Sequence, residues 1–315
     1  MPTVLTAEAH PYARKASARA AAILAALMPL PLVSAANDSP TDLRTEEAPE
    51  STYKTHRRFD RAARLFSEPG LHRLMGARVL VFGMGGVGSF AAESLARSGV
   101  GHLTLVDFDD VCVTNTNRQL HAMRGNIGKP KVEIMAERLR LVSPTATVEP
   151  VRRFYREEDA DELLAGRVDY VIDAIDSIAA KVHLLATCVT RGIPIVSSMG
   201  AAARIDPTRV RTADLADTEV CPLARDVRRL MRVKHGIEVK RGRPIGVTAV
   251  YSEETPIAPA PVSYDEGQGF VCVCPNKDNG MYTCEKRARI DGSASFVTGT
   301  FGMVAASVAV RALIG

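Results

Sequence analysis

The strongest constraint on the fold is a glycine-rich stretch, VLVFGMGGVGSFAAESLA, at residues 79–96. Apolar residues lead into the glycines and small residues of helical character follow, which predicts a buried strand, a tight turn and a helix. We expect Gly83 to permit the turn, Gly85 and Gly86 to let backbone amides approach a phosphate, and Gly88 to pack the helix against the strand. The unpaired amides of the helix N-terminus then favour an anion, although a plain strand–turn–helix corner has the same pattern.

An acidic residue follows the next apolar segment at the spacing of a nucleotide-binding unit. Residues 102–106 form a predicted strand, and Asp107 lies 19 residues after Gly88, where an acid meets ribose hydroxyls in strand–helix–strand units. Asp109 stands two residues further along and is a second candidate for the nucleotide site. Nicotinamide-dependent oxidoreductases and ATP-binding enzymes share this pattern, so both remain open at this point.

Cationic and amide side chains downstream favour ATP. Those expected within reach of the same crevice are Asn115, Asn117, Arg118, Lys129 and Lys131. A dinucleotide is held mainly by backbone amides, whereas a triphosphate attacked at its α-phosphorus needs fixed cations along its other phosphates. Lys131 also begins a predicted helix with an apolar stripe, so a solvated basic helix start is the alternative for that residue.

Two carboxylates follow a third predicted strand, residues 168–172. Asp173 and Asp176 therefore face the edge at which open α/β sheets bind ligands. Asp173 can simply satisfy backbone amides there, and Asp176 is either a helix N-cap or a magnesium ligand. The alternation of strands and helices predicts an α/β fold, with a doubly wound, Rossmann-like, mostly parallel sheet, helices on both faces and a C-terminal substrate-binding extension.

Four motifs in this order carry a resemblance to known enzymes: GMGGVGS, LVDFDDVCVTNTNRQ, GKPK and DAID. They resemble those of the ubiquitin-activating-enzyme-like superfamily of adenylating enzymes. DVCVTNTNRQ and YVIDAIDS look most like the tRNA threonylcarbamoyladenosine dehydratase family, and the resemblance runs from about Arg57 to the C-terminus. It implies an enzyme that uses ATP and magnesium to adenylate the carboxylate of threonylcarbamoyladenosine in tRNA. The carbamoyl group would then displace AMP and close a ring.

The resemblance also implies roles for individual residues in the crevice. Asp107 would hold the ribose, Asp176 would position a magnesium ion that bridges the phosphates, and Asn115 would line the site. Arg118 and Lys131 would neutralise phosphate charge, which must be offset before a carboxylate can approach a triphosphate.

One further arginine, Arg61, lies in a predicted short basic helix before the first strand. By itself the helix is a cap with a solvated face, followed by a turn at Pro69–Gly70. The resemblance implies that Arg61 would reach the ATP of a partner subunit, and therefore that the protein is a homodimer.

A strong local basic signal lies in residues 225–243, although the net charge of the whole chain is only +4. The apolar face of a predicted helix carries Leu223, Val227, Leu230 and Met231. Its other face is expected to carry Arg225, Arg228, Arg229 and Arg232. Like charges on one face repel each other unless a polyanion neutralises them, so we expect this face to bind tRNA, with a solvated charged face as the alternative.

The chain has six cysteines and no CxxC pair, which is typical of reduced thiols in a cytoplasmic enzyme. Superfamily members that load ubiquitin-like proteins as thioesters need an acceptor cysteine, and many hold zinc through CxxC pairs. Here the downstream cysteines are scattered: Cys221, Cys272, Cys274 and Cys284. Two rival functions stay open, an adenylating activator of a ubiquitin-like sulfur-carrier protein and a nucleotide-binding scaffold for a sulfur-transfer partner.

Residues 1–55 are expected to form an extension, either disordered or targeting. The apolar run at residues 20–32 is preceded by basic residues, as in a signal peptide, but it is short for a bilayer span and holds Pro29 and Pro31. We therefore expect no membrane association and a cytoplasmic enzyme.

The remaining 260 or so of the 315 residues divide into three parts. Residues 56–210 are expected to form the ATP-binding domain, and residues 211–295 to recognise tRNA, with a mobile loop over the active site at residues 256–269. Residues 296–315 are apolar but rich in small residues, which favours a helix packed on the core over a membrane span.

Overall fold

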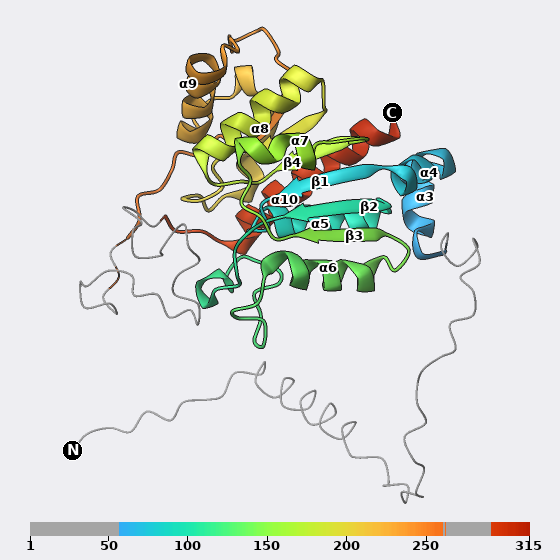
Figure 1. Cartoon of the computed structure of the whole chain (residues 1–315). Helices are drawn as coiled ribbons and strands as arrows, with labels where there is room; N and C mark the ends of the chain where they lie inside the picture. The colour runs from blue at the N-terminus through green and yellow to red at the C-terminus, as the bar shows by residue number, and fades with distance from the viewer. Residues whose placement is uncertain (1–56, 261, 263–290) are drawn as a thin grey trace, which may run out of the picture. The chain divides into compact units, whose positions relative to one another are not determined.

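The computed structural model describes residues 57–260, 262 and 291–315. These residues build a seven-stranded sheet in the order β3-β2-β1-β4-β5-β7-β6 (Figure 1). All neighbouring strands run parallel except β6, which is antiparallel to β7. The predicted α/β class with a doubly wound, mostly parallel sheet is confirmed.

The strands are β1 (Arg78–Phe82), β2 (His102–Val106), β3 (Thr147–Val151), β4 (Tyr170–Asp173), β5 (Ile195–Ser198), β6 (Val210–Asp214) and β7 (Val247–Ser252). The helices are α3 (Asp60–Phe66), α4 (Glu68–Gly76), α5 (Gly88–Ser98), α6 (Lys131–Val142), α7 (Ala160–Leu163), α8 (Ile178–Arg191), α9 (Pro222–His235) and α10 (Ser295–Ile314). The short 3-10 helices η1 (Val113–Asn115), η2 (Glu157–Asp159), η3 (Pro207–Arg209) and η4 (Leu215–Asp217) lie in the connections.

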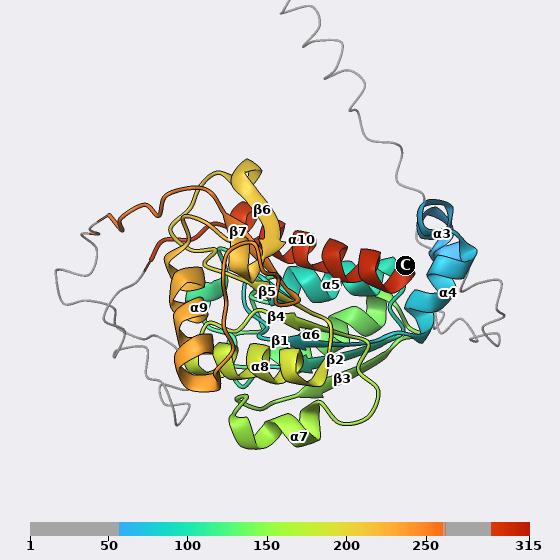
Figure 2. The ribbon, with the colours of Figure 1, turned by 90° about the horizontal axis from the view of Figure 1, so that it is seen from above.

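Helices cover both faces of the sheet because its central strands are apolar on both sides. Val79 and Val81 of β1 belong to the core shared with α5, α6 and α10. Leu80 and Phe82 belong to a second core shared with α7, α8 and α9. Figure 2 shows α5 and α10 on one side of the sheet and α7 and α8 on the other.

Helix α10 packs closely on α5. A Cβ at Gly302 would lie 2.3 Å from the carbonyl oxygen of Val87, and one at Gly299 would lie 3.2 Å from the ring of Phe90. The small residues of α10 therefore serve helix contact. By length and composition α10 is the one candidate membrane span among the described residues, and 56% of its apolar window is buried inside the protein.

The predicted turn at Pro69–Gly70 is wrong. Both residues lie in the first turn of α4, where the missing N–H of a proline leaves no hydrogen bond unmade. The chain instead breaks at Ser67, whose φ is 68° and whose hydroxyl accepts a hydrogen bond from the N–H of Gly70 at 3.3 Å. Arg61 thus lies in α3, separated by α4 from the start of β1.

The predicted tRNA-recognition segment is continuous with the sheet at its β6 edge. Strand β7 pairs with β5, and α9 shares the second core with α8. The extension predicted at residues 1–55 lies outside the described residues. So do most of the loop predicted at residues 256–269 and the cysteines Cys272, Cys274 and Cys284.

Candidate active site

The glycine stretch forms the turn between β1 and α5 at the carboxyl edge of the sheet. Gly83 has a φ of +90°, and a Cβ there would lie 2.6 Å from the carbonyl oxygen of Ala174. A Cβ at Gly88 would lie only 1.7 Å from the carbonyl oxygen of Gly83. The backbone therefore requires glycine at both positions, one for the turn and one for close packing of helix on strand.

The two middle glycines differ from each other. A Cβ at Gly85 would meet no atom closer than Gln119 Nε2 at 3.9 Å, so the backbone is open to a ligand there. At Gly86 a Cβ would lie 2.9 Å from Thr298 Oγ1 and 3.2 Å from Arg118 Cγ. Gly86 thus makes room for α10 and for the stem of Arg118, a role that the sequence pattern did not predict.

Asp107 joins the glycine turn to the end of β2. Its Oδ2 accepts a hydrogen bond from the N–H of Met84 at 2.5 Å, and its Oδ1 accepts one from the N–H of Asp109 at 2.8 Å. Burial raises the pKa of Asp107 above 3.8, against the opposing charge of Lys131. The carboxylate therefore fixes the glycine turn relative to the turn that follows β2.

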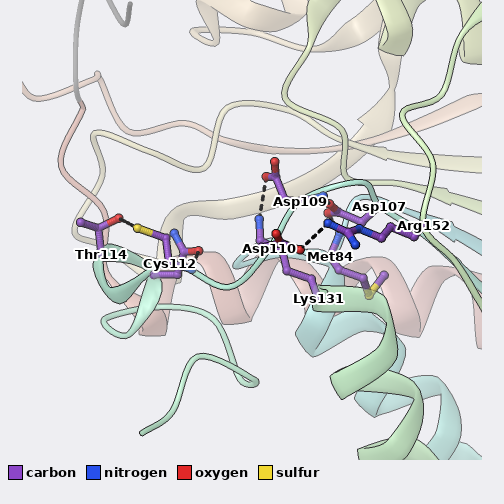
Figure 3. Close-up of polar contacts among 9 residues, drawn as sticks. Met84, Asp107, Asp109, Asp110, Cys112, Thr114, Lys131 and Arg152 are labelled. Carbon is purple, nitrogen blue, oxygen red and sulfur yellow. Dashed lines mark hydrogen bonds and ion pairs between the residues drawn. The ribbon is translucent and has the colours of Figure 1, made fainter. Parts of the chain in front are cut away.

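Lys131, the first residue of α6, points into the same place (Figure 3). Its Nζ lies 2.8 Å from Asp109 Oδ2, and its side chain is 6% exposed. Burial alone would lower the pKa of Lys131, but the carboxylates of Asp107, Asp109 and Asp176 raise it above 10.5. The ammonium therefore stays charged, which excludes a solvated helix start as its explanation.

Asp176 stands on the turn after β4. It is exposed, and it contributes to the electrostatic field at Lys131. Helix α8 begins at Ile178 with Ser177 as its N-cap, so the N-cap alternative for Asp176 is wrong. Asp173 is also more than an acceptor for backbone amides, because its fully buried carboxylate binds the ammonium of Lys181 at 2.5 Å.

Arg118 and Asn115 lie on the connection after β2. Arg118 Nη1 donates to the carbonyl oxygen of Thr114 at 3.0 Å and to Asn117 Oδ1 at 2.8 Å. Asn115 is buried, and its Oδ1 accepts a hydrogen bond from the N–H of Cys112 at 3.1 Å. Its side chain shapes η1, and Arg118 follows three residues later with its stem beside Gly86 of the glycine turn.

Two polar residues near the site were missed from the sequence. Arg152, just after β3, pairs with Asp110 at 2.8 Å and lies beside Asp107 in Figure 3. His121 is fully buried, and neither ring nitrogen has a hydrogen-bond partner among the described residues. Burial, with the nearby charge of Lys131, lowers the pKa of His121 to about 3, so the ring is neutral. A lone histidine after NRQ gives no periodic signal that would have identified it.

The remaining predicted residues do not gather at this edge. Arg61 is exposed on α3, before the amino end of β1, whereas the glycine turn follows the carboxyl end of that strand. The predicted tRNA-binding arginines lie on α9, and Cys221, the residue before α9, is buried. Among the described residues no group of three or more His, Cys, Asp or Glu side chains could hold a metal ion by itself.

The chain is similar in sequence and in structure to known proteins. The model of the ThiF family matches residues 59–315. The tRNA threonylcarbamoyladenosine dehydratase of Escherichia coli (strain K12) is 41% identical over 262 residues, 82% of this chain and 93% of that protein. Its namesake in Bacillus subtilis (strain 168) is 46% identical over 199 residues, 63% of this chain and 76% of that protein.

Among solved structures, the E. coli tRNA N6-threonylcarbamoyladenosine dehydratase in complex with ATP superposes with a TM-score of 0.71. It is 38% identical, and the match covers 84% of this chain and 96% of that chain. Because the family model and the relatives both cover most of the chain, the protein belongs to the ThiF family, in the branch that holds the tRNA threonylcarbamoyladenosine dehydratases.

Proposed function

We propose that this protein is an ATP-dependent tRNA threonylcarbamoyladenosine dehydratase. The observation that carries the proposal is the cluster of Lys131, Asp109 and Asp107 at the open backbone of Gly85. Relatives of this name match over most of the chain, and a solved structure of one of them contains ATP. A dinucleotide site has no need for a buried, charged lysine beside its glycine turn.

The reaction proceeds in two displacements. The carboxylate of the threonyl group attacks the α-phosphorus of ATP and releases pyrophosphate, which leaves an acyl-adenylate. The carbamoyl group then attacks the activated carbonyl carbon, AMP leaves with the former carboxylate oxygen, and the ring closes. One water is thereby removed from the modified nucleoside as ATP becomes AMP and pyrophosphate.

The side chains of the site supply charge and position. Lys131 and Arg118 offset the negative charge of the phosphates, which otherwise repels the incoming carboxylate. Asp107 holds the glycine turn through Met84, and thereby fixes the backbone amides that face the phosphates. Ring closure needs only a leaving group and fixed geometry, which together lower a barrier by ~7–11 kcal/mol in favourable cases.

The residues present fit a magnesium ion bound together with ATP. The carboxylates of Asp107, Asp109 and Asp176 all lie near enough to Lys131 to raise its pKa, so this edge of the sheet offers oxygen ligands of the kind that magnesium prefers. Magnesium is usually held by one or two carboxylates plus substrate phosphates, so a cage of protein ligands is not needed. Asp176, exposed at this edge, would hold the ion, and the ion would draw charge away from the phosphates.

Helix α9 supplies the proposed contact with tRNA. Arg225, Arg229 and Arg232 are exposed on it. Arg228 is partly buried, and its Nη1 donates to the carbonyl oxygen of Thr218 at 3.0 Å, so it holds α9 to the turn after η4. We therefore assign phosphate binding to the three exposed arginines and a structural part to Arg228.

The active assembly is proposed to be a homodimer. Arg61 lies on α3, before the start of β1, and the nucleotide turn follows the end of that strand, so a second copy of the chain would have to bring Arg61 to the ATP. A cytoplasmic location accompanies the proposal, because tRNA and ATP are both there. A sulfur-transfer protein remains a candidate partner.

The test is ATP–pyrophosphate exchange with three substrates in parallel. We expect exchange with tRNA that carries threonylcarbamoyladenosine, and none with the same tRNA lacking that modification. Exchange that requires a protein ending in Gly-Gly would instead identify an activator of a sulfur-carrier protein. Binding of ATP with no exchange under any condition would identify a nucleotide-binding scaffold.

A further inference from the structure

A fully buried ion pair lies at the end of β4, next to the turn that carries Asp176. Lys181 of α8 and Asp173 at the end of β4 are both 0% exposed, and Lys181 Nζ lies 2.5 Å from Asp173 Oδ2. Neither residue belongs to the cluster around Lys131. The pair therefore needs an explanation of its own, since charges are rarely buried away from water without a function or a complete set of partners.

The pair has a complete set of partners. The three N–H groups of the Lys181 ammonium have three acceptors: Asp173 Oδ2 at 2.5 Å, the carbonyl oxygen of Ser198 at 2.9 Å and Ser197 Oγ at 3.3 Å. The hydroxyl of Ser197 donates in turn to Asp173 Oδ2 at 2.5 Å. Because every N–H of the Lys181 ammonium is engaged, this lysine has a structural role and is neither a nucleophile nor a proton carrier.

The same network fixes the turn that carries Asp176. Asp173 Oδ1 accepts a hydrogen bond from the N–H of Ile175 at 3.0 Å. The N–H of Ala174 donates to the carbonyl oxygen of Phe82 at 2.8 Å, and the carbonyl of Ala174 packs against the bare backbone of Gly83. The turn between Asp173 and Asp176 is thus fixed at two points: the carboxylate of the ion pair binds Ile175, and the glycine turn contacts Ala174.

Stability alone does not account for this arrangement. Replacing a buried ion pair by apolar residues of similar size is often neutral or stabilising, because desolvation offsets the attraction between the charges. What an apolar pair cannot do is accept the N–H of Ile175 and bind the ends of β4 and β5 together. The directional bonds therefore serve geometry at the edge of the sheet.

We propose that Asp173 and Lys181 are positioning residues that hold the Asp176 carboxylate where it acts with Lys131 on the phosphates and their metal ion. This inference rests on the proposed function, because it assumes that Asp176 works on bound ATP. In these roles neither Asp173 nor Lys181 needs to contact the substrate. Their effect passes through the backbone turn, from Asp173 to Ile175 and then to Asp176.

The principal test is the double variant Asp173→Leu/Lys181→Met, which removes both buried charges and the acceptor of the Ile175 N–H and leaves no unpaired ion. The probe is Mn²⁺ together with an ATP analogue in which a methylene group replaces the oxygen between the α- and β-phosphorus. We expect a melting temperature close to that of the unaltered protein, and Mn²⁺ affinity lower by about tenfold or more, as is typical when the support of a metal ligand is removed. With Mg²⁺ and modified tRNA, kcat is expected to fall while KM for tRNA stays the same.

Two further variants keep the result interpretable. Leu184→Ala removes a fully buried apolar side chain one turn further along the same helix, which forms no hydrogen bond with the turn that carries Asp176. It is expected to lower the melting temperature and leave Mn²⁺ affinity unchanged. Ser197→Ala keeps the ion pair but removes the hydroxyl that donates to Asp173 Oδ2 and accepts from Lys181 Nζ. It is expected to weaken Mn²⁺ binding by about two- to threefold, since such hydrogen bonds each contribute little. This mild variant decides the question if the double variant does not fold.

The inference is overturned if the folded double variant, or Ser197→Ala in its place, binds Mn²⁺ as tightly as the unaltered protein. It is also overturned if Leu184→Ala weakens Mn²⁺ binding equally. Failure of the proposed function looks different, because the unaltered protein would then form no AMP with modified tRNA. The metal-binding comparison needs no tRNA and is read separately.

Discussion

The carboxylate of Asp107 accepts the backbone N–H of Met84 across 2.5 Å, and this bond joins the end of β2 to the glycine turn after β1. The same side chain accepts the N–H of Asp109, whose own carboxylate binds Lys131. The side chain of Asp107 thereby links the glycine turn, the turn after β2 and, through Asp109, Lys131 of α6. Because of this linkage, a change at one of these residues should alter how the others meet ATP.

Replacing Asp107 by Ala should loosen the glycine turn. The N–H groups of Met84 and Asp109 lose their acceptor, and these hydrogen bonds are partly buried, so the free energy of unfolding falls by about 1 kcal/mol or more for each. We expect ATP affinity to fall by about tenfold or more, because the amides that face the phosphates are no longer fixed. Calorimetric titration with ATP measures this, and unchanged affinity would contradict the role given to Asp107.

Replacing Lys131 by Met should abolish most catalysis. A buried cation that acts on charge developing at phosphorus contributes about 100- to 1,000-fold to the rate, so we expect ATP–pyrophosphate exchange to fall by about that factor. Arg138 is the matched control, because it lies on the same helix but pairs with Glu93, outside the cluster around Lys131. Arg138→Met should retain exchange close to that of the unaltered protein, and equal losses in both variants would contradict the assignment.

His121 should make the fold sensitive to acid. Its pKa is lowered from 6.5 to about 3 by burial and by Lys131, so the unfolded chain binds a proton between these values while the folded protein does not. The free energy of unfolding therefore has its full value above about pH 6.5 and decreases as the pH falls toward about 3. His121→Leu should remove part of this decrease in urea titrations across that range. The same pH dependence in both proteins would contradict it.

The exposed arginines of α9 should govern tRNA binding. In Arg229→Ala/Arg232→Ala we expect weaker binding and a salt dependence whose slope falls by about one for each arginine–phosphate pair removed, with KM for ATP unchanged. Arg167→Ala is a control on an exposed arginine paired with Asp169 before β4. Arg228→Ala should instead lower the melting temperature, because it releases the carbonyl of Thr218. Binding is measured by fluorescence anisotropy with labelled tRNA. Equal affinity of all the variants would contradict the role given to the exposed arginines.

The proposed homodimer can be tested by mixing two inactive proteins. Arg61→Ala and Asp176→Asn should each be inactive alone, since each removes a residue needed at every site. In a mixed dimer one site receives Arg61 from one chain and Asp176 from the other, so random reassociation should restore about a quarter of the activity. The mixture is refolded together and assayed for AMP. No recovery, with mixed dimers demonstrated by mass spectrometry, would contradict a shared site.

Much of this site could be predicted from sequence because its signals are local. The glycine spacing predicts the turn at Gly83 and the packing at Gly88, both of which depend on backbone geometry within a few residues. The edge strand β6 could not be predicted, since it buries little and alternates weakly. Arg228 looks like its neighbours in sequence, and only the position of η4 shows that it faces the protein.

The buried pair of Lys181 and Asp173 shows the limit more clearly. Lys181 is a lone charge in the apolar run IAAKVHLLATCV, which is a signal that a helix has a charge on its buried face. Its partners come from the ends of two strands, and their convergence depends on the pairing of β4 with β5. Tertiary contacts of this kind are not encoded at a fixed spacing.

The most direct measurement of the central claim follows one oxygen atom. Modified tRNA is prepared with oxygen-18 in the carboxylate of the threonyl group and incubated with the protein, Mg²⁺ and ATP. An acyl-adenylate requires that the AMP released carries one labelled oxygen and that the nucleoside loses one water. Unlabelled AMP, or ADP with phosphate in place of AMP, would contradict it.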